Sequence, residues 1–175
     1  HAIGRKWEHD GLEVFQERRA VEIALRIVSE LRQLLPTPTG PTAIGASSEG
    51  DLYQLPTAMA EVTLREAGWA ATNLGSCLPF ATLEASLHQY QPRIFWLSLS
   101  NIVEEAAFVR EYSGFVELAE EAGTAVVLGG RALSESLRRR IRYAAFCDNL
   151  QHLESFANSL IGRDSPATET QTPSD

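Results

Sequence analysis

Short apolar runs alternate with amphipathic helical stretches along most of this chain, and that alternation limits the possible folds more than any other feature. Five apolar runs of strand length are predicted, at residues 42–47, 69–74, 94–99, 125–128 and 143–147. Helical periodicity is predicted at residues 52–67, 81–90, 103–122, 134–140 and 150–161. Strands separated by helices pair through parallel crossovers, so the pattern predicts an α/β fold, a flavodoxin-like (Rossmann-like) sheet of five parallel strands.

A helical segment precedes the alternating region. Apolar residues at helical spacing predict an amphipathic helix at residues 14–35. The following Pro36-Thr37-Pro38-Thr39-Gly40-Pro41 lacks amide donors and has fixed backbone angles, which marks a linker. We therefore divide the chain into a helical cap that is part of a bundle (1–36), a linker (37–41), the α/β domain (42–162) and a tail (163–175) expected to be disordered.

Composition limits the partners of the chain. Fifteen basic and 23 acidic residues give a net charge of -8, which repels nucleic-acid phosphates, so we expect no direct contact with nucleic acid. No apolar run is long enough to span a membrane and no secretory signal is found, so we expect a cytoplasmic protein. The two cysteines, Cys77 and Cys147, match no metal-binding spacing.

Small and hydroxylated residues gather where three of the predicted strands end. Open parallel sheets bind ligands at the carboxyl ends of their strands, beside the point where the strand order reverses. Ser98 and Ser100 lie at the end of the third strand, and Gly129 and Gly130 lie at the end of the fourth. Each residue is also explained by a tight turn or a helix cap. Their coincidence with the turn at residues 47–51, after the first strand, favours a ligand pocket.

The spacing of these residues resembles that of the cobalamin-binding domain. That family has Asp-x-His-x-x-Gly, then Ser-x-Leu or a variant, then Gly-Gly. This chain has Asp51-x-Tyr53-x-x-Pro56, then Ser98-x-Ser100, then Gly129-Gly130.

The helical segment adds to this resemblance. Trp7 and Glu17, with nine residues between them, are similar to the Trp-x9-Glu-His motif of cobalamin-dependent, light-responsive MerR-type transcription regulators of the CarH and LitR kind. The resemblance implies a sensory domain with a helical cap over its ligand. It also implies a homo-oligomer, with DNA bound by a part of the regulator N-terminal to this chain.

Three positions depart from the family pattern. Tyr53 stands where the family has its histidine cobalt ligand, Pro56 replaces the glycine, and Arg18 follows Glu17 in place of histidine. A neutral phenol is a poor cobalt ligand, so the resemblance implies cobalamin held without a protein ligand to the metal. The residues implied in binding are Trp7, Glu17, Asp51, Tyr53, Ser98, Ser100, Gly129 and Gly130.

Other interpretations remain open. Because phenolate can bind ferric haem iron, a haem-type tetrapyrrole is one alternative ligand. In another, the chain is a protein-interaction or dimerisation module with a vestigial pocket. Asp51 then only caps the helix at 52–67, whose buried stripe is predicted to be Leu52, Leu55, Met59 and Val62. No set of acid, base and nucleophile is found, so we expect binding rather than catalysis.

Overall fold

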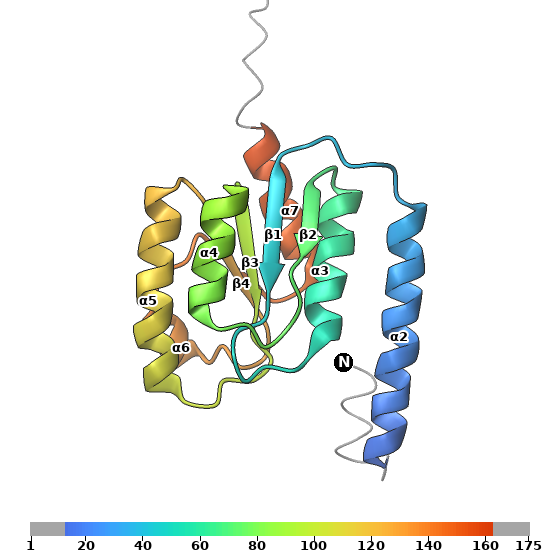
Figure 1. The fold of residues 1–175 in the computed structure, drawn as a ribbon, viewed down its shortest axis with the longest axis horizontal. Coiled ribbons are helices and arrows are strands. Elements are labelled where there is room, and N and C mark those ends of the chain that lie inside the picture. Colours follow the sequence, from blue (N-terminus) through green and yellow to red (C-terminus); the bar gives the residue numbers. More distant parts are fainter. Residues whose placement is uncertain (1–12, 163–175) are drawn as a thin grey trace, which may run out of the picture.

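The first strand, β1 (Thr42–Ala46), lies between β2 (Ala70–Asn73) and β3 (Ile94–Ser98), so the strand order reverses there. The computed structural model describes residues 13–162. Its sheet has the order β2-β1-β3-β4-β5, completed by β4 (Ala125–Gly129) and β5 (Ala145–Cys147), and every pairing is parallel (Figure 1). The predicted flavodoxin-like sheet is confirmed.

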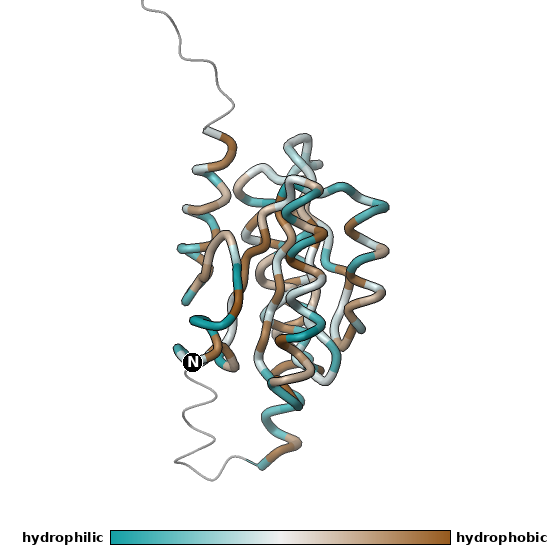
Figure 2. Tube along the Cα trace, turned by 90° about the vertical axis from the view of Figure 1, so that its left-hand side faces the viewer, coloured by the Kyte–Doolittle hydropathy of each residue, from teal (hydrophilic) through white to brown (hydrophobic). Residues whose placement is uncertain are grey.

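Helices cover both faces of the sheet. One hydrophobic cluster lies beneath α3 (Gln54–Glu66) and α7 (Leu150–Gly162), and a second lies beneath α4 (Phe80–Tyr90) and α5 (Glu105–Glu121). The short α6 (Glu135–Arg138) precedes β5. All elements predicted between residues 42 and 162 are present, with ends displaced by no more than two residues. Along the helices hydrophobic and hydrophilic residues alternate (Figure 2), as helices that cover a sheet require.

The N-terminal helix α2 (Val14–Leu34) stands outside this arrangement and packs along α3 (Figure 1). The carboxylate of Glu61, on α3, is almost fully buried. It pairs with Arg65 on the same helix at 3.1 Å and with Arg32 of α2 at 3.5 Å. None of the residues of α2 is buried, and Phe15, Ile27 and Leu34 on this helix are exposed. No helix within residues 13–162 is long and apolar enough to cross a bilayer.

A glycine in the middle of β1 makes room for a tryptophan of β3. A Cβ atom on Gly45 would lie 2.1 Å from the ring of Trp96, far inside van der Waals contact. The indole Nε1–H of Trp96 donates to Thr57 Oγ1 on α3 at 3.0 Å, and Thr57 Oγ1 donates to Asn73 Oδ1 at 3.1 Å. The indole ring is therefore held between the sheet and α3 by both shape and hydrogen bonding.

We predict that Gly45→Ala lowers the free energy of unfolding by about 1–3 kcal/mol, because the added methyl group must displace the Trp96 ring. Urea denaturation followed by tryptophan fluorescence measures this change. Gly114→Ala is the control, because a Cβ at that exposed position of α5 meets nothing within 4 Å and alanine favours the helix. Equal stability of the two variants would show that Trp96 does not depend on Gly45.

Candidate functional site

The carboxylate of Asp51 is completely buried between the ends of β1 and β3. Its Oδ1 accepts a hydrogen bond from the Tyr53 amide at 3.0 Å. Its Oδ2 accepts from the amides of Ser100 at 2.6 Å and Asn101 at 3.3 Å. In the opposite direction, Asn101 Nδ2 donates to the carbonyl of Gly50 at 3.0 Å. These bonds join the loop after β1 to the loop after β3.

The loop after β2 is tied to the same place. The hydroxyl of Ser47 donates to the carbonyl of Asp51 at 2.7 Å and accepts from the amide of Cys77 at 3.1 Å. The amide of Gly50 also donates to the sulfur of Cys77 at 3.4 Å. Three strand-end loops therefore form one connected layer above the carboxyl edge of the sheet.

This geometry corrects one interpretation of Asp51. The N-cap of α3 is Tyr53, and its side chain makes no capping bond. Asp51 precedes the cap by two residues, so it is not the helix cap that the vestigial-pocket interpretation assumed. Its oxygens instead accept three backbone amides from two loops. The carboxylate is a structural link across the point where the strand order reverses.

Tyr53 lies half-buried beneath an arginine. The guanidinium carbon of Arg131 is 5.1 Å from the centroid of the Tyr53 ring, within the range of a cation–π contact. Arg131 Nε also donates to the carbonyl of Ser100 at 3.3 Å. Tyr53 is therefore packed against a cation that follows Gly129-Gly130 directly.

A cavity of about 680 Å³ opens beside this layer, between α3 and α7. Its floor consists of strand residues, among them Trp96 and Val127, together with Leu153 of α7. Polar and small residues lie at the strand ends and just past them: Ser98, Ser100, Gly129, Gly130 and Arg131. The cavity is apolar inside and polar where the strands end, which is typical of sites for small organic ligands.

The predicted buried stripe of α3 is wrong. Leu52 is 65% exposed and Met59 is 37% exposed, while the buried residues of the helix are Thr57, Ala60, Glu61 and Leu64. The polar side chains of this set face inward because Trp96, Asn73 and two arginines satisfy them. The rotation of the helix turns Leu55, Pro56 and Met59 toward the cavity instead.

The structure brings most of the predicted binding residues together. Ser98, Ser100, Gly129 and Gly130 line the cavity, and Tyr53 contacts its rim through Arg131. Glu17 is a partly exposed residue of α2, and no described residue of α2 lines the cavity. Trp7 lies outside the described residues, as does the C-terminal tail.

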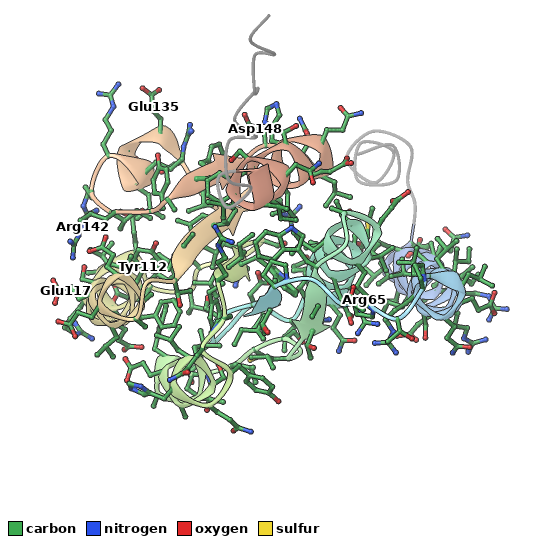
Figure 3. The ribbon with its side chains drawn as sticks, turned by 90° about the horizontal axis from the view of Figure 1, so that it is seen from above. Arg65, Tyr112, Glu117, Glu135, Arg142 and Asp148 are labelled. Carbon is green, nitrogen blue, oxygen red and sulfur yellow. The ribbon has the colours of Figure 1, made fainter. Side chains whose placement is uncertain are left out.

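Sequence reasoning missed several lining residues. Arg131 could have been found from its position directly after Gly129-Gly130. Asp148, an exposed residue directly after β5 (Figure 3), stands next to no motif that the sequence analysis had identified. Cys147 also lines the cavity, and burial raises its pKa to about 11. Within residues 13–162, no three histidine, cysteine, aspartate or glutamate side chains are close enough together to hold a metal ion.

The chain has a relative among transcription regulators. It is 32% identical over 124 residues to the HTH-type transcriptional repressor CarA of Myxococcus xanthus, a match that covers 70% of this chain and 40% of the repressor. The chain thus spans less than half the length of that relative. No model of a known protein family matches the sequence.

Solved structures give the fold. The monomethylamine corrinoid protein of Methanosarcina barkeri matches with a TM-score of 0.68 and 14% identity, over 91% of this chain and 77% of that one. A cobalamin-binding protein of Desulfitobacterium hafniense matches with a TM-score of 0.55 and 18% identity, over 90% of this chain and 75% of that one. The α/β domain has the cobalamin-binding fold. The methanol:cobalamin methyltransferase complex MtaBC of Methanosarcina barkeri has a similar fold, with a TM-score of 0.60 and 16% identity over 91% of this chain and 63% of that one.

The resemblance inferred from motif spacing is therefore confirmed in two ways. The fold is that of cobalamin-binding domains, and the sequence relative is a transcriptional repressor. The strand-end motifs contribute Pro56, Ser98, Ser100, Gly129 and Gly130 to one cavity, although these residues are far apart in the sequence.

We predict that Asp51→Ala lowers the free energy of unfolding by about 2–4 kcal/mol, because amides of two loops lose their buried acceptor. Urea denaturation measures the loss. Glu49→Ala, an exposed carboxylate in the same loop, is the control and is expected to change stability by less than about 0.5 kcal/mol. Similar effects of the two substitutions would contradict the role of Asp51 as a structural link.

Proposed function

We propose that this chain is a cobalamin-binding sensory domain of a cytoplasmic transcription regulator, and that it acts by binding rather than by catalysis. The observation that carries the proposal is the cavity at the carboxyl edge of a sheet with the cobalamin-binding fold. The similarity to a transcriptional repressor supports the regulatory role. DNA would be bound by another part of the regulator, since the net charge of this chain is -8.

The cavity suits the nucleotide part of cobalamin, which is a planar aromatic base joined to a ribose and a phosphate. A volume of about 680 Å³ is in the range of small-ligand pockets. Trp96, Val127 and Leu153 offer the base an apolar floor. Gly129 ends β4 and Gly130 follows it; a Cβ on Gly130 would lie 2.2 Å from the Leu99 carbonyl oxygen, so glycine lets the turn after β4 pack closely on the loop after β3. When bound, the corrinoid would supply a reactive bond between cobalt and its upper ligand.

Tyr53 sets this domain apart from a histidine-ligated one. We infer that it lies beneath the corrin ring as a packing surface, fixed by the Arg131 guanidinium. Asp51, which would orient a histidine in the family, is instead bonded to the three amides already described. The cobalt would then have no ligand from this chain on its lower face.

The outer face of α2 supports assembly. Phe15 is 67% exposed and Ile27 is 51% exposed, on a helix with no buried residue. Exposed apolar residues along one helix indicate contacts with further helices. We propose that they are covered by the rest of the helical cap or by a second copy of the chain, which agrees with a sensory domain that oligomerises.

The proposal is tested by mixing the purified chain with adenosyl-, methyl- and hydroxocobalamin, and separately with haemin, before gel filtration. The expected result is that cobalamin co-elutes with the protein, as seen in its visible spectrum. If haemin co-elutes with the protein and no cobalamin does, the haem alternative is favoured. No co-eluting chromophore would favour an interaction module with a vestigial pocket.

The lower face of the cobalt is tested by Tyr53→His. If residue 53 lies beneath the metal, the imidazole is expected to shift the visible spectrum of bound hydroxocobalamin, because neutral imidazole is a good ligand and phenol is not. His152, exposed on α7 outside the cavity lining, serves as the comparison through His152→Tyr, which should leave the spectrum unchanged. An unchanged spectrum in Tyr53→His would place residue 53 away from the cobalt.

The cavity itself is tested by filling it. Met59→Trp places an indole against the opening, and its partial exposure lets the larger side chain be accommodated. Cobalamin affinity is expected to fall at least about tenfold, the effect of losing roughly 1.4 kcal/mol of binding. Gln89→Trp, at an exposed position of α4 on the other face of the sheet, should have no effect. Equal affinities, measured by equilibrium dialysis, would show that the ligand does not enter this cavity.

A further inference from the structure

The arginines that follow β4 differ in their partners: Arg138 lies over the Phe146 ring, and three others pair with carboxylates. Arg139 pairs with Glu135, Arg140 with Glu105, and Arg142 with Glu117 and Glu120 (the pair with Glu117 is visible in Figure 3). In the part of the chain that the structure describes, Arg131 forms no such ion pair. It is also the one basic side chain among the described residues that line the cavity.

The contacts of Arg131 hold it in place without using its terminal nitrogens. Its guanidinium lies over the Tyr53 ring, and its Nε donates to the Ser100 carbonyl at 3.3 Å. A guanidinium has five N–H donors, and its two terminal nitrogens suit the paired oxygens of a phosphate. The side chain is therefore positioned by neutral groups while its charge remains available to a ligand.

Arg131 lies at the polar end of the cavity, away from its apolar floor. The floor is apolar, and polar groups lie at the strand ends and just past them, where Ser98, Ser100 and Arg131 are found. A ligand whose aromatic base rests on the floor near Trp96 brings the linked phosphate toward this rim. Asp148 is the one carboxylate among the described lining residues, and it follows β5, whereas Arg131 follows β4.

We propose, building on the proposed cobalamin function, that Arg131 binds the phosphodiester of the nucleotide part and so makes this domain selective for corrinoids that carry a complete nucleotide. Tyr53 contributes to the same selection, because its ring supports the guanidinium from below. The two residues act together: Tyr53 offers no ligand to the cobalt, and Arg131, which Tyr53 supports, binds the phosphate instead.

The test compares hydroxocobalamin with cobinamide, which keeps the corrin ring and lacks the base, ribose and phosphodiester linkage. Affinities are measured by equilibrium dialysis for the parent chain, Arg131→Met, Arg131→Lys and the control Arg139→Met, whose side chain pairs with Glu135 outside the cavity lining. Arg131→Met is expected to weaken hydroxocobalamin binding about tenfold and leave cobinamide binding unchanged. Arg131→Lys, which keeps the charge, should recover part of the loss.

Three results would overturn the inference. Equal hydroxocobalamin affinities of Arg131→Met and Arg139→Met would remove Arg131 from the site. Equal weakening of both corrinoids would show that Arg131 acts on the corrin ring or on Tyr53 rather than on the phosphate. Failure of the parent chain to bind either corrinoid would refute the cobalamin function as well, whereas the first two results leave it standing. Thermal unfolding of each variant shows whether a loss of corrinoid affinity comes from misfolding. If Arg131→Met is misfolded, the hydroxocobalamin affinity of Arg131→Lys relative to the parent chain tests the inference instead.

Discussion

The buried carboxylate of Asp51 is the interaction on which the arrangement of the site depends. In a sheet whose strand order reverses at β1, the loops after β1 and β3 diverge and leave a crevice. Asp51 connects them by accepting amides from both, and Ser47 extends the link to the loop after β2. A charged group buried in this way is stable only because its hydrogen-bond partners are fixed. The link therefore defines the surface on which a ligand would rest.

The consequences of this link reach Tyr53 and Arg131. Asp51 fixes the amide of Tyr53 and the amide of Ser100, and Arg131 contacts both the Tyr53 ring and the Ser100 carbonyl. The rim of the cavity is thus assembled from three strand ends. Its floor depends on a second set of contacts, in which Gly45 makes room for Trp96 and Thr57 holds the indole. An apolar cavity with one cation at its opening follows from these two sets.

The sheet and its helices could be predicted from the sequence because the alternation of apolar runs and helices has few solutions. The strand-end residues Ser98, Ser100, Gly129 and Gly130 could be placed together for the same reason, since parallel strands bring their carboxyl ends to one edge. The rotation of α3 could not. Periodicity treats Leu55 and Met59 as core and Thr57 and Glu61 as surface, but buried hydrogen bonds and ion pairs reverse that assignment. The apolar residues left over by the core are those that line the cavity.

The central claim is that a corrinoid binds at this edge with its nucleotide in the cavity between α3 and α7 and its metal above Tyr53. Crystals of the chain grown with hydroxocobalamin and measured at the cobalt absorption edge test it most directly. The account predicts a single anomalous peak per chain on the Tyr53 side of the carboxyl edge, with density for the base against Trp96. A cobalt peak elsewhere on the domain, or an empty cavity beneath a bound corrin ring, would contradict it.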